Sequence, residues 1–239
     1  MESIKSGFYQ TFILDNNYQY FIRGIGITLL VTVFALVLGL ALGVLVAIIR
    51  SAHDQQPKNK RGIILRVLNL LCKVYLTVIR GTPMMVQLLI MWFVVWASSR
   101  ATDGNMVRCA VLSFGINSGA YVAEIVRSGI MSIDKGQMEA GRSLGLSYVK
   151  TMRFIIIPQA FKNVLPALGN ELITLLKETS IVTVIGLKDL TKGAMIIAAN
   201  TYQALVPYVA IAAIYLAMVM LLTWLLGIME RRLRKSDIR

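Results

Sequence analysis

The sequence predicts an all-α integral membrane protein with five transmembrane helices, and three observations lead to that fold class. The 239 residues are 56% hydrophobic, and their mean hydropathy of +0.68 is well above that of an ordinary soluble domain. The charged residues lie between and after long apolar runs rather than on one polar face. Those runs are long enough for spans of about 20 residues. The net charge of +13 therefore indicates basic loops at a membrane surface and not a nucleic-acid partner.

The chain is predicted to form one transmembrane domain, residues 1–239, with five spans. These are residues 24–49, 81–99, 106–130, 164–187 and 206–228. The first span has no charged residue in 26 positions, and its Gly39-x-x-x-Gly43 pattern permits close contact with another helix. The fourth contains Pro166 and Gly169, so we expect an interrupted helix there.

A further amphipathic helix is predicted just before the second span, at residues 65–79. Arg66, Lys73 and Arg80 follow one another at sevenfold spacing, which places the three cations on one helix face. Such a helix suits the membrane interface and leads into the span that follows.

The distribution of lysine and arginine orients the five spans. With the N-terminus outside, eighteen of the 25 basic residues fall in inner segments and six in outer ones, while Lys177 lies within the fourth span. Cytoplasmic loops carry the excess of basic residues in membrane proteins. The sequence therefore predicts an external N-terminus, a cytoplasmic C-terminus and a cytoplasmic loop between the third and fourth spans.

That loop contains a short predicted helix, at about residues 135–144. Asp134 followed by Gln137 is a capping-box pattern, and Gly145 suits a left-handed helix end. A helix of this length is too short to span a bilayer and is marginal alone in water, so it needs a packing partner. The small residues Ala140 and Gly141 would let the backbone of a partner approach closely.

The order of residues in EAGRSLGLSYVKTMRFIIIPQA, residues 139–160, resembles the EAA motif of permease subunits of bacterial ABC importers. In that family a short cytoplasmic helix docks on a separate ATPase. The third position is Gly rather than Ala, and the residue before Pro158 is Ile rather than Leu; both departures keep size and polarity. The resemblance implies that ATPase coupling depends on Glu139, Ala140, Gly141, Arg142, Leu144 and Gly145.

Other segments are similar to the polar-amino-acid branch of these importers, which includes histidine, arginine and glutamine permeases. They are Arg80-Gly81-Thr82-Pro83 with Gln87, Ser118 to Tyr121, Glu124 to Arg127, Leu165-Pro166, Gly169 to Glu171, and Leu176 to Ser180. The similarity covers about residues 18–235. It implies a type I importer permease core, like that of the methionine permease, in the cytoplasmic membrane of a bacterium.

The resemblance also implies partners. They are two copies of an ABC ATPase, a second permease subunit that is identical or related, an extracytoplasmic amino-acid-binding protein, the amino acid itself and membrane lipid. ATP and Mg²⁺ would bind to the ATPase, and this chain is expected to bind no metal or cofactor. It lacks the G-x-x-x-x-G-K-[ST] phosphate loop, so we expect a transporter subunit and not an enzyme.

Charges within the fourth span are the candidates for substrate binding, because charged groups in a bilayer are costly and must face protein or water. Thr179 and Ser180 are predicted to cap a half-helix that begins near Ile181 and binds the α-carboxylate of an amino acid. An acidic side chain would bind the ammonium or a basic side chain, which favours basic substrates. With the polar and aromatic residues of the similar segments added to these charges, the candidates are Glu171, Glu178, Thr179, Ser180, Asn170, Lys177, Tyr121 and Gln87. Alternatively, these charges stabilise the contact with the second permease.

Two other classes of function compete with the importer. An ATP-independent secondary transporter or channel for small polar solutes would also place Glu and Lys in the membrane. The odd number of spans and the lack of an internal repeat argue against it. A membrane enzyme is disfavoured because the chain has one histidine, His53, and neither an H-E-x-x-H nor a G-x-S-x-G motif.

Overall fold

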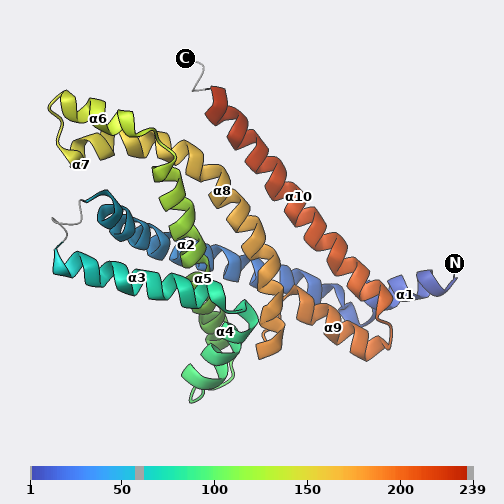
Figure 1. Cartoon of the computed structure of the whole chain (residues 1–239). Helices are drawn as coiled ribbons and strands as arrows, with labels where there is room; N and C mark the ends of the chain where they lie inside the picture. The colour runs from blue at the N-terminus through green and yellow to red at the C-terminus, as the bar shows by residue number, and fades with distance from the viewer. Residues whose placement is uncertain (1, 57–61, 236–239) are drawn as a thin grey trace. The chain divides into compact units, whose positions relative to one another are not determined.

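The computed structural model describes residues 2–56 and 62–235, and these residues form helices joined by short turns (Figure 1). The chain divides into two compact units. Unit 1 comprises Met1–Leu36, Pro83–Phe114 and Ile173–Gly227, and unit 2 comprises Val37–Thr82, Gly115–Leu172 and Ile228–Arg239. Four residues that contribute to the predicted charge asymmetry lie outside the described residues, namely Lys58, Lys60, Arg61 and Arg239.

Among the residues that the structure describes, three helices are long and apolar enough to cross a membrane. Their qualifying stretches are Tyr18–Asp54 of α2 (Tyr18–Gln55), Asp103–Met131, which is α5, and Leu205–Leu233 of α10 (Leu205–Lys235). They contain the predicted spans 24–49, 106–130 and 206–228, so these three predictions are confirmed as long apolar helices. The number of five spans and the side of the membrane on which each terminus lies stay predictions.

The predicted second span is shorter than expected and follows a break in the helix. The amphipathic helix α3 (Ile63–Gly81) ends before Thr82, and α4 (Met84–Ile90) begins after Pro83 and continues as a π-helical turn, Met91–Val95. Proline lacks an amide hydrogen and disfavours a helical residue before it, which explains the break. Counted as one broken span, this helix pair brings the candidate spans in the described residues to four.

The fourth predicted span is interrupted after Glu178, where a second half-helix was expected, and not at Pro166 or Gly169. A π-helical turn, Met152–Ile156, leads into α8 (Ile157–Glu178), which continues through Pro166 and is followed by a 3₁₀ helix, Thr179–Ile185. The hydroxyl of Thr179 donates backward to the carbonyl of Leu176 at 2.8 Å. Thr179 therefore caps no new half-helix, and the prediction of a helix start near Ile181 is wrong.

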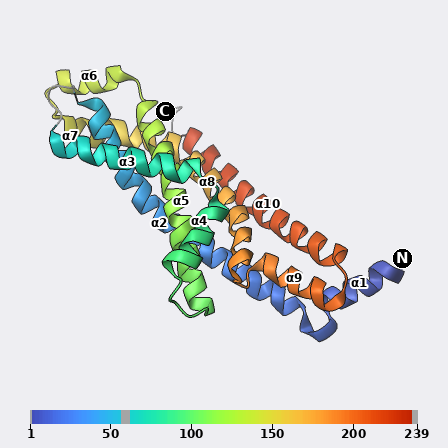
Figure 2. The ribbon, with the colours of Figure 1, turned by 60° about the horizontal axis from the view of Figure 1, so that its bottom comes forward.

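Unit 1 contains the next helix start, at Asp189, which caps α9 (Leu190–Thr201). Its carboxylate accepts hydrogen bonds from the amides of Thr191 at 3.0 Å and Lys192 at 2.9 Å, and the residue is fully buried. Leu190 packs with Phe21 of α2 in one apolar cluster. The helix α1 (Glu2–Phe12) lies beside α9 in both views (Figures 1 and 2).

Unit 2 is held together by glycines that bring α2 and α5 close. A methyl group on Gly43 would lie 2.5 Å from Cγ1 of Val122, and one on Gly39 would lie 3.0 Å from Cβ of Ser118. The close contact predicted from Gly39-x-x-x-Gly43 is therefore confirmed. Against these helices packs α3, whose buried Cys72 and Leu76 join an apolar cluster in the same unit.

Candidate functional site

The short helix predicted in the charged loop is present as α6 (Lys135–Ser143). Asp134 caps it by accepting a hydrogen bond from the amide of Gly136 at 2.7 Å. Gly145 has a φ of 80°, and the amide of Leu146 donates to the carbonyl of Gly141 at 3.1 Å. This is the Schellman arrangement that ends many helices. The predicted helix at residues 135–144 is thus confirmed to within one residue.

Only some of the α6 residues that were predicted to contact a partner are exposed to solvent. Gly141 is buried against the chain's own α7 (Tyr148–Thr151) and the π-helical turn after it, which lie beside α6 (Figures 1 and 2). A methyl group there would lie 2.6 Å from Cγ2 of Thr151 and 3.3 Å from Cδ1 of Ile155. Gly141 therefore serves internal packing and not the approach of a partner. The exposed residues of the predicted set are Glu139, Ala140, Arg142, Leu144 and Gly145.

Replacing Gly141 with valine is therefore expected to loosen α6 from unit 2. Overpacking of this kind typically costs about 1–3 kcal/mol, so the midpoint of thermal unfolding in detergent should fall. Ala140→Val is the matched control, because Ala140 is the exposed neighbour on the same helix. Equal midpoints for the two variants would contradict the packing role of Gly141.

A cavity of about 430 Å³ in unit 2, here called the α6 cavity, lies beside this helix. Glu139 and Met138 line it from α6, Tyr148 from α7, and Asp54 from α2. Burial raises the pKa of the Tyr148 phenol, so this group stays neutral at physiological pH. The walls thus combine apolar surface with a few charges.

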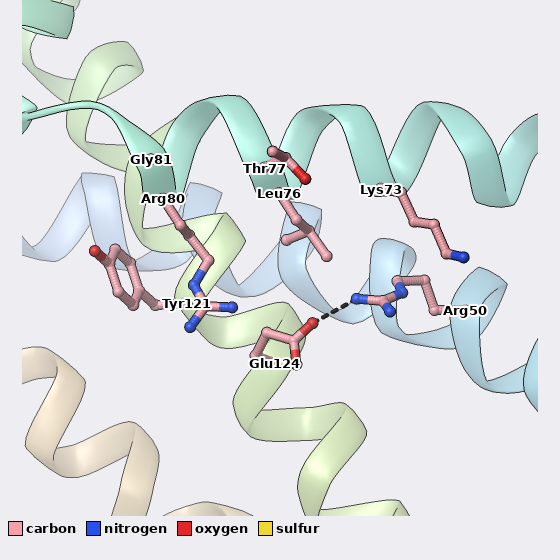
Figure 3. Close-up of a pocket in the computed structure, with 8 residues that line it drawn as sticks. All are labelled: Arg50, Lys73, Leu76, Thr77, Arg80, Gly81, Tyr121 and Glu124. Atoms are coloured by element: carbon pink, nitrogen blue, oxygen red, sulfur yellow. Dashed lines mark hydrogen bonds and ion pairs between the residues drawn. The ribbon is translucent and has the colours of Figure 1, made fainter.

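A second cavity of about 570 Å³, here called the cationic cavity, also lies within unit 2 (Figure 3). Three helices contribute its charged and aromatic residues. The charged and aromatic residues are Arg50 from α2, Lys73 and Arg80 from α3, and Tyr121 and Glu124 from α5, and the hydroxyl residue Thr77 of α3 lies beside them. The positions 73, 76, 77 and 80 recur at the spacing of one helix face, so α3 presents a continuous wall to the cavity.

Electrostatics make this cavity attractive to an anion. Glu124 is the only carboxylate among the described residues that line it, and it is paired with the guanidinium of Arg50 (Figure 3). It is also paired with Arg127, whose Nη2 lies 3.2 Å from Oε2. The guanidinium of Arg80 lies over the ring of Tyr121, 5.5 Å from the ring centre, in cation–π geometry. Arg80 and Lys73 thus leave positive charge facing the open space.

The structure brings one of the predicted substrate residues, Tyr121, into a cavity. Glu171 lies in unit 2, where its Oε1 accepts a hydrogen bond from Ser118 at 2.8 Å, but it lines neither cavity. Asn170 is an exposed residue of the same unit. The remaining candidates belong to unit 1 and likewise line neither cavity, namely Gln87, Lys177, Glu178, Thr179 and Ser180. Thr179 is fully buried and its hydroxyl donates to Leu176, so its side chain does not serve as the predicted cap. Binding of a carboxylate at Thr179 and Ser180 stays a prediction.

Sequence reasoning missed Arg50, Lys73, Arg80 and Glu124 as residues of a cavity. The sevenfold spacing of Lys73 and Arg80 was the available signal, together with the Thr82-Pro83 break that leaves Arg80 in the last turn of α3. That spacing was interpreted as an interfacial face only. No spacing rule could connect it with Arg50 and Glu124, which come from other helices.

Helices of membrane-spanning length, together with a polar cavity lined by α2, α3 and α5, are typical of a multi-pass membrane permease. The chain belongs to the family of binding-protein-dependent transport system inner membrane components, whose model matches residues 63–235. Members of that family are components of transporters and not enzymes. The family generally implies ATPase and binding-protein partners.

Several known proteins are similar over most of the chain. The arginine transport system permease protein ArtQ of Bacillus subtilis is 38% identical over 218 residues, which is 91% of this chain and 94% of that protein. The glutamine transport system permease protein GlnP of Escherichia coli K12 is 36% identical over 213 residues, covering 89% and 92%. The resemblance to arginine and glutamine permeases is therefore confirmed.

Solved structures support the same fold. A chain of an amino acid ABC transporter crystallised with histidines has a TM-score of 0.80 and 42% identity, covering 90% of this chain and 94% of that one. A chain of the inward-facing MetNI methionine ABC transporter has a TM-score of 0.74 at 18% identity, covering 92% and 99%. The second likeness concerns the fold alone, which is that of a type I ABC permease, as expected.

Proposed function

We propose that this chain is the membrane-spanning subunit of an ATP-driven importer of polar amino acids, with the cationic cavity as a site on the substrate's path. The observation that carries this proposal is the cavity itself, in which Arg80 and Lys73 face open space while Glu124 is held by two arginines. Every amino acid presents a carboxylate, and Arg binds carboxylates in a forked, charge-assisted geometry. The names of the arginine and glutamine relatives support the substrate class.

The charges of this cavity favour a neutral polar amino acid over a basic one. Three cationic side chains line it against one carboxylate, so a basic side chain would meet net repulsion. A preference for basic substrates, based on Glu171 and Glu178, is the second candidate, and the arginine relative supports it. Both possibilities can be compared in one assay.

The assembly that we propose follows the family. Five spans place the N-terminus outside and the C-terminus in the cytoplasm of a bacterium, an arrangement supported by the excess of basic residues in the inner segments. A second permease subunit, identical or related, completes the pathway, and an external protein delivers the amino acid. Two ATPase subunits bind ATP and Mg²⁺, and this chain binds neither.

Coupling to ATP is proposed to pass through α6. Its exposed residues Glu139, Ala140 and Arg142 form a charged and small surface on which an ATPase can dock. Closure of the ATPase pair would move α6 and, with it, α7 and the π-helical turn, because Gly141 fixes α6 against them. That movement would close the inner side of the pathway and open the outer side to the loaded binding protein.

The experiment is ATP hydrolysis by this chain assembled in lipid with its ATPase and binding protein, across a panel of amino acids. We expect stimulation by one or a few polar amino acids. Glu139→Lys should lower uptake by about tenfold or more, since like-charge contacts at an interface cost several kcal/mol. Asp103→Lys, an exposed acid at the start of α5, is the matched control. Hydrolysis that no amino acid changes would instead favour the ATP-independent alternative.

A further inference from the structure

Arg127, near the end of α5, contacts two carboxylates from different helices of unit 2. Its Nη2 lies 3.2 Å from Oε2 of Glu124, one turn earlier on α5. Its Nη1 lies 3.8 Å from Oδ2 of Asp54 on α2. The planar guanidinium presents its N–H groups in a fixed fork, so one side chain can face two acids at once.

These two carboxylates line different cavities. Glu124 lines the cationic cavity, and Asp54 lines the α6 cavity, which Glu139 and Arg142 of α6 also line. All of these residues belong to unit 2. Arg127 is therefore the side chain that joins a wall of the proposed substrate site to a wall of the cavity beside the coupling helix.

The ion pairs of Arg127 are suited to change with the contents of the cationic cavity. Glu124 is shared between Arg50 and Arg127, and the three side chains are 16–27% exposed, so solvent screens them less than an open surface pair. An ammonium group that enters the cavity competes with both guanidiniums for Glu124. Arg127 then gains by closer pairing with Asp54, which is already within 3.8 Å.

We propose that Arg127 is a positioning residue that links occupancy of the cationic cavity to the setting of α6. It pairs more closely with Glu124 when the cavity is empty and with Asp54 when an amino acid is bound. The shift moves charge at the wall of the α6 cavity, next to Glu139 and Arg142. This inference rests on the proposed function, because it takes the cationic cavity as a substrate site.

The test uses the complete transporter in lipid, with the amino acid that stimulates hydrolysis most. The measured quantity is the ratio of ATP hydrolysis with loaded binding protein to hydrolysis without it. We expect Arg127→Gln to lower this ratio at least about fivefold, the lower end of typical coupling between two sites. Arg127→Lys keeps the charge but not the fork, so its ratio should lie between those of Arg127→Gln and the wild type. Arg108→Gln, an exposed arginine on the same helix, should leave the ratio unchanged.

A double-mutant cycle separates linkage from a merely structural role. Asp54→Asn should also lower the ratio, and the Arg127→Gln, Asp54→Asn double variant should be no lower than Arg127→Gln alone, because both changes break the same pair. Equal ratios for Arg127→Gln and the wild type, or fully additive effects, would overturn the proposal. If Arg127→Gln fails to assemble, the ratios of Arg127→Lys and Asp54→Asn decide, and wild-type values for both would overturn it.

Failure of the proposed function gives a different result. If no amino acid stimulates ATP hydrolysis by the wild-type complex, the cationic cavity is not a substrate site. The proposed link through Arg127 then fails as well. Normal stimulation of the wild type together with normal stimulation of every Arg127 and Asp54 variant would overturn the link alone and leave the importer function standing.

Discussion

Gly24→Ala is expected to destabilise the protein strongly, whereas Gly26→Ala, two residues further along α2, is expected to be neutral or slightly stabilising. A methyl group on Gly24 would lie 2.6 Å from Cα and 2.8 Å from the amide nitrogen of Leu190, distances that carbon atoms do not adopt. A methyl group on Gly26 would have nothing within 4 Å. The same substitution therefore has opposite consequences at two neighbouring positions.

The clash at Gly24 cannot be relieved by turning a side chain, because it involves backbone. The amide of Leu190 donates to the hydroxyl of Thr28 at 3.4 Å, and buried Asp189 caps α9 at the same place. Moving the start of α9 away would disturb both interactions. Overpacking typically costs about 1–3 kcal/mol, and we expect the upper part of that range.

The comparison is measured as the midpoint of thermal unfolding of the purified protein in one detergent. Gly24→Ala should lower the midpoint clearly. Gly26→Ala should keep or raise it, since alanine is favoured over glycine inside a helix by roughly 0.5–1 kcal/mol. Equal midpoints for the two variants would contradict the close contact between α2 and α9 within unit 1.

Features that depend on nearby residues could be predicted from the sequence. The helix α6 is one example, because Asp134 and Gly145 define its two ends within a few residues of chain. The long apolar helices are another, because length and lack of charge suffice to identify them. The contact through Gly39 and Gly43 could also be predicted, since small residues four apart recur where two helices pack closely.

Features that depend on tertiary contacts could not be predicted from the sequence. Thr179 has the chemistry of a helix cap, but its hydroxyl bonds backward to Leu176, and the chain continues as a 3₁₀ helix. A hydroxyl can make either bond, and the local sequence does not decide between them. Gly141 has the small size expected at a partner's surface, yet its neighbours are Thr151 and Ile155 of the same chain.

The residues that line the cationic cavity could not be predicted from the sequence either. Its walls come from positions 50, 73–81 and 121–124, three segments separated by long stretches of sequence. Charges cost most inside an apolar run, and for that reason Glu171 and Glu178 were the predicted substrate residues. Arg80 and Lys73, at the edge of an apolar run, were interpreted as interfacial residues.

Arg80→Ala is expected to weaken amino-acid binding by roughly 13- to 45-fold. A hydrogen bond to a charged group contributes about 1.5–3 kcal/mol, and we take the lower half of that range because Arg80 faces an open cavity. Loss of the guanidinium also removes its cation–π contact with Tyr121. Binding would be measured by equilibrium dialysis of labelled amino acid against the purified transporter. Arg66→Ala is the control, since Arg66 lies on α3 at the same sevenfold spacing but does not line the cavity.

The pattern across ligands identifies the group that Arg80 holds. If Arg80 binds the α-carboxylate, which all amino acids share, Arg80→Ala should weaken the binding of every transported amino acid by a similar factor. The decarboxylated amine of the best substrate should then bind equally weakly to the wild type and to Arg80→Ala, because the group that Arg80 recognises is missing. A loss confined to one amino acid would show instead that Arg80 contacts the side chain. Unchanged binding of all of them would remove Arg80 from the substrate site, and with it the main reason for placing the amino acid in the cationic cavity.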